Sequence, residues 1–140
     1  MQVITKNTQE TIELGRRIAK TLIPSSIVAL FGDLGSGKTV LVKGIAEALG
    51  GKAENVLSPS FVLMREYKTK IPLYHFDLYR IEKTDVLHLG FEEYFYGNGI
   101  SVVEWADRIK DDLPKDCLRV NFYIKGDNKR VIKINQRIDI

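Results

Sequence analysis

The sequence is poor in the residues that build disulfides and zinc sites. Its 140 residues include one cysteine, Cys117, and two histidines, His75 and His88. A lone cysteine cannot form a disulfide within the chain, and these side chains cannot make up a zinc cluster of the usual Cys/His kind. We therefore expect a protein that works in the reducing cytoplasm.

Long apolar runs are also missing. The longest run, residues 27–31, has five residues, whereas a transmembrane helix needs about 20. The N-terminus has neither the basic stretch nor the apolar stretch of a signal peptide. The sequence thus predicts a protein that is neither exported nor inserted in a membrane.

Charge of one sign is not concentrated anywhere in the chain. Lys and Arg number 21 and Asp and Glu 18, which gives a net charge of +3 without blocks of five or six like charges. This excess is too weak to indicate nucleic-acid binding on its own. The 140 residues, 44 % of them apolar, match the length of about one domain and suffice for one core. We expect residues 1–140 to form a single domain.

Periodic apolar residues and helix breakers predict a mixed α/β chain. Asn7 and Glu10 have the spacing of a capping box, after which apolar residues recur every four positions until Pro24 ends the helix. A second helix is expected over residues 39–49, and a looser one over 84–95, where a glycine interrupts the pattern. The expected strands are residues 27–31, 61–67, 73–77, 100–104, 118–124 and 131–134. Turn-like connections join 61–67 to 73–77 and 118–124 to 131–134, which predicts two antiparallel hairpins.

One motif carries phosphate chemistry. Residues 32–39 match G-x-x-x-x-G-K-[ST] and lie between an expected strand and an expected helix, as a P-loop requires. Glycines let the backbone wrap a phosphate with its N–H groups pointing inward, and the positive end of the helix dipole adds attraction. In such a loop Lys38 reaches the β- and γ-phosphates and the Thr39 hydroxyl ligates Mg²⁺. The expected nucleotide-binding residues are Gly32, Asp33, Leu34, Gly35, Ser36, Gly37, Lys38 and Thr39. The expected fold is therefore α/β and P-loop NTPase-like, with helices flanking a mixed central sheet.

A P-loop also needs an acid at the end of a neighbouring strand to hold the metal ion or its water, and two are present. Glu104 ends the strand 100–104, which has the apolar character of a buried central strand. Asp77 ends the strand 73–77, which mixes polar and apolar positions as a half-solvated strand does. We assign metal ligation first to Glu104, together with Thr39. Asp77 is left to position the attacking water or to support the metal's ligands.

Phosphoryl transfer needs positive charge near the γ-phosphate beyond the P-loop lysine. Arg80 and Arg108 follow the two acids by three and four residues, and either could supply it. A surface arginine in a weak ion pair is the competing interpretation, and it is stronger for Arg108. Trp105 could pack on the nucleotide or a partner, although a large aromatic residue after a strand is more often core. His75 fits a strand residue better than a catalytic base. The candidate catalytic residues are Asp77, Lys38 and Arg80, and Trp105 joins the candidate nucleotide contacts.

Four segments resemble the motifs of the TsaE family (formerly YjeE), small bacterial ATPases required for the threonylcarbamoyl modification of tRNA adenosine. They are residues 32–39, 58–61 (Ser-Pro-Ser-Phe), 75–80 (His-Phe-Asp-Leu-Tyr-Arg) and 103–105 (Val-Glu-Trp), in the family's order over nearly the whole chain. The family usually has alanine at position 36 and threonine at position 60. Ser36 is close in size to alanine, and Ser60 keeps the hydroxyl of threonine.

The resemblance implies a site, cofactors and partners. Thr39 and Glu104 would bind Mg²⁺, Asp77 would support ATP hydrolysis, Thr8 would approach the nucleotide, and residues 58–61 would form a switch-like loop. It further implies an accessory ATPase with ATP and Mg²⁺ as cofactors, slow without partners, that acts with the TsaB–TsaD heterodimer. Contact with tRNA would be indirect, through that complex.

Two other classes of function stay open. A small-molecule kinase would use the same loop, but 140 residues leave little room for an acceptor pocket and a lid. A nucleotide-dependent RNA or protein adaptor without hydrolysis would use the basic terminal hairpin, which carries Lys125, Lys129, Arg130, Lys133 and Arg137. Because a glycine-aromatic RNA signature is missing, a solvated basic face is the favoured interpretation of that hairpin.

Overall fold

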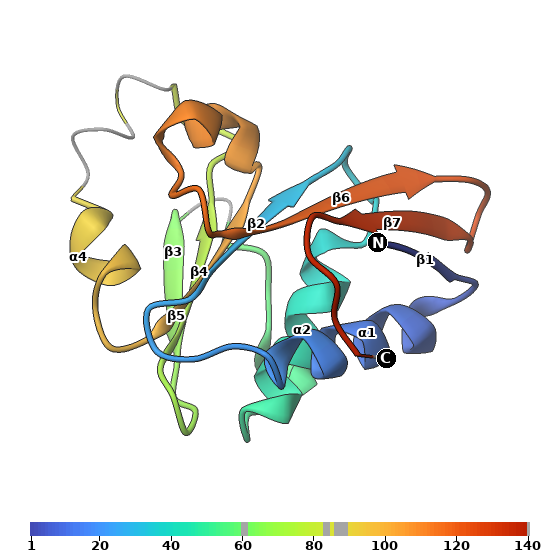
Figure 1. Cartoon of the computed structure of the whole chain (residues 1–140), viewed down its shortest axis with the longest axis horizontal. Coiled ribbons are helices and arrows are strands. Elements are labelled where there is room, and N and C mark those ends of the chain that lie inside the picture. The colour runs from blue at the N-terminus through green and yellow to red at the C-terminus, as the bar shows by residue number, and fades with distance from the viewer. Residues whose placement is uncertain (60–61, 83–84, 86–89, 140) are drawn as a thin grey trace.

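Seven strands form one mixed β-sheet in the computed structural model, which describes residues 1–59, 62–82, 85 and 90–139 (Figure 1). The strands are β1 (Gln2–Thr5), β2 (Ile27–Phe31), β3 (Met64–Tyr67), β4 (Leu73–Asp77), β5 (Ile100–Glu104), β6 (Leu118–Ile124) and β7 (Arg130–Ile134). Their order across the sheet is β1-β7-β6-β2-β5-β4-β3. The four central strands β6, β2, β5 and β4 are parallel, while β7 and β1 on one side and β3 on the other pair antiparallel. This is the α/β fold with a mixed central sheet that the sequence predicts.

The parallel centre gathers the carboxyl ends of its strands at one edge of the sheet. β2 pairs with β5 and β6, and its alternate side chains enter cores on the two faces of the sheet, which explains its continuous apolar sequence. The register pairs Leu30 of β2 with Glu104 of β5, and Glu104 with Asp77 of β4. The P-loop and both candidate acids therefore emerge at the same edge.

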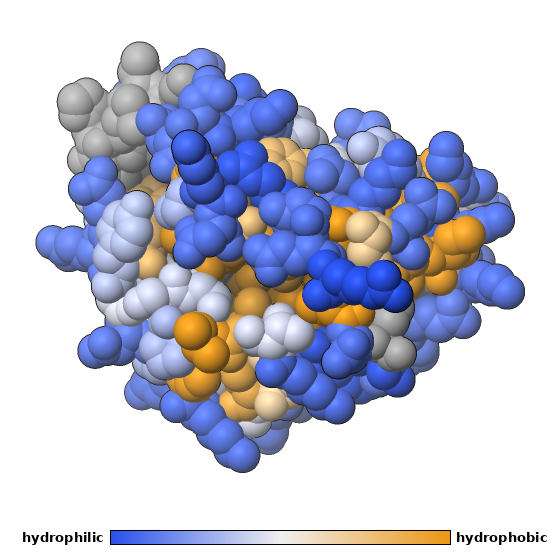
Figure 2. Space-filling view, viewed as in Figure 1, coloured by the Kyte–Doolittle hydropathy of each residue, from blue (hydrophilic) through white to orange (hydrophobic). Residues whose placement is uncertain are grey.

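Helices cover both faces of the sheet. α1 (Thr8–Ala19) and α2 (Lys38–Ala48) lie together on one face, as Figure 1 shows, and bury a core that includes Ile18, Leu41 and Val102. On the other face α4 (Glu92–Phe95) and the 3₁₀ segment η2 (Ala106–Asp112) enclose a second core around Phe76 and Val103. Neighbouring residues of one strand enter different cores because strand side chains alternate between faces. The surface seen in Figure 2 is hydrophilic over most of its area, with smaller hydrophobic areas between.

Two predicted boundaries are wrong. The first helix ends at Ala19 rather than near Leu22, because the N–H groups of Thr21 and Leu22 bond three residues back, to Ile18 and Ala19, in a tightened last turn. Of the predicted strand 61–67, residue 61 lies outside the described part, and over the described residues the strand begins only at Met64. The N–H groups of Val62 and Leu63 close a turn on the Pro59 carbonyl, and Leu63 has a φ of +70° that no strand accommodates.

Other predictions hold in part. The helix starts at the Asn7 cap, whose side chain accepts from the Glu10 N–H at 2.8 Å, and α2 and the hairpin of β6 and β7 match their expected ranges within one residue. Of the expected helix 84–95, the structure gives α4 (Glu92–Phe95), and residues 84 and 86–89 lie outside the described part. β1, η2 and the short 3₁₀ turn η1 (Ala53–Asn55) were not predicted. Within the described ranges, no helix has the length and apolar character needed to cross a membrane.

The contact between α1 and α2 provides a test of the packing. A β-carbon added at Gly44 would lie 1.9 Å from the backbone oxygen of Ile12. We expect Gly44→Ala to lower the free energy of unfolding by about 2 kcal/mol or more, because the helices must separate, although alanine normally suits a helix interior better than glycine. The neighbouring Lys43→Ala should change it by less than about 0.5 kcal/mol. Urea unfolding measures both, and equal stability of the two variants would contradict this packing.

Candidate functional site

The P-loop is shaped by the turn from β2 into α2. Gly37, the residue before the helix, has a φ of +107°, a left-handed conformation that glycine adopts without strain. The first N–H groups of α2 have no partner within the helix and face the loop, where the positive end of the helix dipole lies. Ser36 is buried, and its hydroxyl oxygen is without a hydrogen-bond partner among the described residues. Such a loop offers donors to an anion.

Lys38 is folded back into this loop. Its ammonium donates to the backbone oxygens of Gly32 and Asp33, the latter at 3.1 Å, and lies 3.8 Å from the centre of the Trp105 ring. Burial lowers the pKa of Lys38 below its usual value, while the carboxylates of Glu104 and Asp77 oppose the shift. A partly desolvated cation held by neutral carbonyls is available to an anion that enters the loop.

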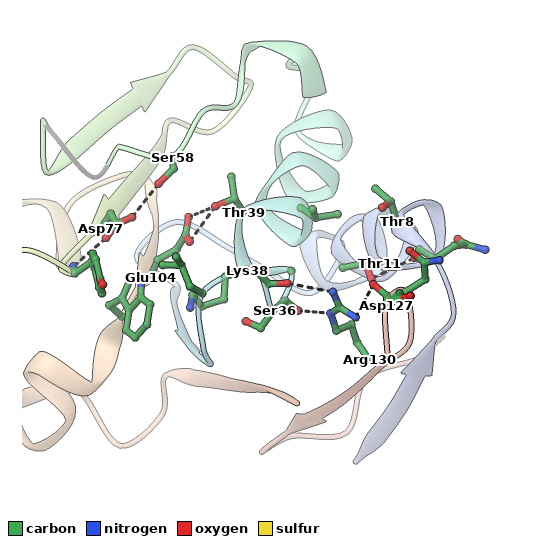
Figure 3. Close-up of a pocket in the computed structure, with 18 of the residues that line it drawn as sticks. Thr8, Thr11, Ser36, Lys38, Thr39, Ser58, Asp77, Glu104, Asp127 and Arg130 are labelled. Carbon is green, nitrogen blue, oxygen red and sulfur yellow. Dashed lines mark hydrogen bonds between the residues drawn. The ribbon is translucent and has the colours of Figure 1, made fainter. Parts of the chain in front are cut away.

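The side chains of Thr39, in the first turn of α2, and Glu104, at the end of β5, face each other (Figure 3). The Thr39 hydroxyl lies 3.0 and 2.8 Å from the two carboxylate oxygens of Glu104, which is only 3 % exposed. The adjacent, parallel position of β5 brings this acid to the first turn of α2. A hydroxyl and a carboxylate are both oxygen ligands, the kind that Mg²⁺ takes together with phosphate oxygens and water. In the part of the chain that the structure describes, no group of three or more His, Cys, Asp or Glu side chains could hold a metal. Metal binding by Thr39 and Glu104 stays a prediction.

Asp77 has different partners. Its carboxylate accepts from the Ser58 hydroxyl at 3.0 Å and from the Tyr79 N–H at 2.9 Å. Ser58 belongs to the segment expected to act as a switch, of which residues 60 and 61 lie outside the described part. The expectation that β4 is half-solvated is wrong, because its polar side chains His75 and Asp77 are 0 % and 3 % exposed and have hydrogen-bond partners inside the protein. The two acids have different hydrogen-bond partners, Thr39 for Glu104 and Ser58 with Tyr79 for Asp77, and their different roles stay a prediction.

These residues line one cavity of about 560 Å³. The predicted site residues that line it are Thr8, Leu34, Gly35, Ser36, Gly37, Lys38, Thr39, Asp77, Arg80, Glu104 and Trp105. Gly32 and Asp33 are not part of the lining and contribute backbone oxygens to Lys38 instead. The roles assigned to all of them stay predictions.

The two candidate arginines occupy different places. Arg80 is exposed and lines the cavity. Arg108 does not line it and donates to the backbone oxygen of Tyr79 at 3.2 Å. The Tyr79 ring packs on Trp105, with ring centres 4.7 Å apart. Trp105 itself has a φ of +57°, which is uncommon for a residue other than glycine and occurs where the surrounding structure enforces it.

Sequence reasoning missed the contribution of the terminal hairpin. The guanidinium of Arg130 donates to the backbone oxygens of Gly35 at 3.1 Å and Ser36 at 3.2 Å, and Asp127 and Asn128 in the turn also line the cavity (Figure 3). No local signal marks Arg130, because it lies 94 and 95 positions from the two loop residues that it contacts. Arg130 thus contacts the P-loop and lines the cavity, so it does not belong to the solvated basic face that was predicted for the hairpin.

A buried parallel strand that runs into a lysine-containing glycine loop, with an acid from the next strand against the loop threonine, defines the P-loop NTPase class. The comparison with known proteins is more specific. The family described as "Threonylcarbamoyl adenosine biosynthesis protein TsaE" matches residues 5–132, and the chain belongs to this family.

The chain aligns with similar proteins along most of their length. The chain is 41 % identical over 129 residues to the tRNA threonylcarbamoyladenosine biosynthesis protein TsaE of Bacillus subtilis, covering 91 % of this chain and 80 % of that protein. It is 34 % identical to the protein of the same name from Treponema pallidum, covering 96 % and 99 %. The crystal structure of Bacillus subtilis YdiB superposes with a TM-score of 0.80 at 38 % identity, covering 94 % of this chain and 82 % of that one.

Proposed function

We propose that this chain binds Mg-ATP and hydrolyses it to ADP and phosphate, as an accessory protein of tRNA threonylcarbamoyladenosine biosynthesis. The observation that carries the proposal is the pair of Thr39 and Glu104 beside the buried ammonium of Lys38, at the mouth of a glycine loop. Membership of the TsaE family supports the pathway, and the single buried cysteine fits a cytoplasmic setting.

In the proposed reaction each group has one task. The Lys38 ammonium gives up its hydrogen bonds to the loop carbonyls and donates to oxygens of the β- and γ-phosphates. The backbone N–H groups of the loop donate to the same phosphates. Thr39 and Glu104 hold Mg²⁺, which neutralises charge on the phosphates. Asp77 orients the attacking water, and Arg80 supplies charge near the γ-phosphate. Trp105 covers the Lys38 side of the site.

The proposed partner is the TsaB–TsaD heterodimer, with tRNA reached through that complex. The cavity is open at Ser58, Tyr79 and Arg80, all of which are exposed, so water and solvent ions reach the reacting groups. Closing such a site excludes water and strengthens the electrostatic interactions within it. We therefore propose slow hydrolysis by the chain alone and faster hydrolysis when the partners order these segments.

We expect TsaB–TsaD to raise the rate of ATP hydrolysis and to tighten ATP binding by about tenfold, a typical coupling between sites. The coupling must be reciprocal, so a non-hydrolysable ATP analogue must tighten binding of the pair by the same factor. Titrating ATP with and without the pair measures one arm, and titrating the pair with and without the analogue measures the other. If the pair neither binds nor alters ATP affinity or turnover, the proposed partnership is wrong.

A further inference from the structure

A chain of hydrogen bonds, buried at His75 and exposed at Leu57, leads away from the Thr39 and Glu104 pair of the site. Nε2 of His75 lies 2.5 Å from Oε2 of Glu104, and Nδ1 of the same ring lies 3.1 Å from the Tyr67 hydroxyl. The Tyr67 hydroxyl in turn contacts the backbone of Leu57, 3.2 Å from its oxygen and 3.4 Å from its nitrogen. Leu57 directly precedes Ser58, whose hydroxyl donates to Asp77.

The sheet explains how these groups meet. Positions 73, 75 and 77 of β4 point to the same face, since strand side chains alternate, and β5 brings Glu104 beside Asp77 in register. β3 pairs with β4 so that Arg65 lies opposite His75 and Tyr67 stands two residues further on. His75 is 0 % exposed and Glu104 3 %. The imidazole is therefore fixed from both sides in a dry environment, where each hydrogen bond has a defined partner.

A buried carboxylate has four lone-pair sites and can rotate unless its partners fix it. A carboxylate only accepts, so Nε2 of His75 is the donor in this contact, and it holds Oε2 at one side of the group. The Thr39 hydroxyl lies within hydrogen-bond distance of both carboxylate oxygens, 2.8 Å from the same Oε2 and 3.0 Å from Oε1. If Thr39 and Glu104 bound a metal ion, the contact with His75 would still hold the carboxylate.

We propose that His75 and Tyr67 are positioning residues, which fix the Glu104 carboxylate for Mg²⁺ and tie it to the backbone at Leu57. This inference rests on the proposed Mg-ATP binding and concerns groups that do not touch the nucleotide. The same hydrogen bonds connect Leu57, the residue before Ser58, to Glu104 through Tyr67 and His75. Groups that orient a metal ligand in this way typically affect metal affinity 10- to 100-fold. Burial raises the pKa of the Tyr67 phenol, so its hydroxyl keeps the proton that the link needs.

Two histidine variants separate positioning from packing. The amide nitrogen of glutamine reaches the place of Nε2, whereas that of asparagine reaches only the place of Nδ1. His75→Gln should therefore keep the bond to Glu104 and His75→Asn should lose it. Tyr67→Phe removes the hydroxyl, and Tyr74→Phe is its control, because Tyr74 lies on the other face of β4, against Tyr94.

The measurement is the affinity for a fluorescent, non-hydrolysable ATP analogue, titrated with Mg²⁺ chelated and then at increasing Mg²⁺. We expect His75→Asn to keep the Mg²⁺-free affinity within about twofold and to raise the half-saturating Mg²⁺ concentration about tenfold or more. His75→Gln should stay within about threefold of the wild type, and Tyr67→Phe should shift in the same direction as His75→Asn while Tyr74→Phe does not.

Several results would overturn the inference. They are an unchanged Mg²⁺ dependence in His75→Asn, an equal loss with and without Mg²⁺, or equal behaviour of the asparagine and glutamine variants. If His75→Asn does not fold, Tyr67→Phe decides, and the inference fails if it behaves like Tyr74→Phe. A wild-type protein without Mg²⁺-dependent nucleotide binding would instead contradict the proposed function itself, and the inference would fall with it.

Discussion

Lys38→Ala is expected to lower the affinity for Mg-ATP about 100-fold. The ammonium of Lys38 is the buried cation of the loop, and its bonds to phosphate oxygens would be charge-assisted. Loss of two such bonds, at about 1.5 kcal/mol or more each, corresponds to roughly that factor. Calorimetric titration with a non-hydrolysable ATP analogue measures the change.

The fold should survive this substitution. Lys38 contacts loop carbonyls and the Trp105 ring, and its side chain is not part of the apolar core. We expect the free energy of unfolding to change by no more than about 1 kcal/mol. Lys43→Ala, five residues further along the same helix, should bind nucleotide as the wild type does. A folded Lys38→Ala protein with wild-type affinity would contradict the assignment of the site.

Glu104→Gln and Asp77→Asn are expected to fail in different ways. Glu104 faces Thr39, so its loss should raise the half-saturating Mg²⁺ concentration for nucleotide binding about 30-fold or more. Asp77 contacts Ser58 and the Tyr79 N–H, so its loss should lower kcat about 100-fold while nucleotide affinity stays within about threefold. That pattern marks an interaction made only in the transition state.

The two neutral amides are matched to each other, because each removes one charge and keeps the volume of a buried side chain. Binding titrations at several Mg²⁺ concentrations and single-turnover ATP hydrolysis separate the two effects. An equal loss of Mg²⁺ affinity in both variants would refute this division of labour between the acids.

The centre of the fold could be predicted because its signals are local. The apolar run 27–31, the glycine loop and the helix after it follow one another in the sequence, and each supports the next. β1 gave no such signal. It is a four-residue edge strand whose pairing partner, β7, lies about 130 residues away, with Gln2 opposite Lys133. Its existence depends on that pairing and not on its own composition.

The residues of the candidate site also differ in whether the sequence could place them. Glu104 could be placed near Thr39 because parallel strands end at one edge and an apolar strand belongs beside β2. Arg130 could not, because its contact with the loop requires β6 to pair beside β2 and β7 to return antiparallel to β6. His75 was correctly expected to be a strand residue, but its two hydrogen-bond partners come from β3 and β5, and single-strand patterns do not reveal them.

Release of inorganic phosphate from Mg-ATP tests the central proposal most directly. The purified wild-type protein would be compared with Lys38→Ala and Thr39→Ala, each with Mg²⁺ present and with Mg²⁺ chelated. We predict slow release by the wild type that requires Mg²⁺, and release at the background rate by both variants. Phosphate release by folded Lys38→Ala at the wild-type rate, or wild-type release that persists without Mg²⁺, would contradict a P-loop ATPase that works through Lys38, Thr39 and Glu104.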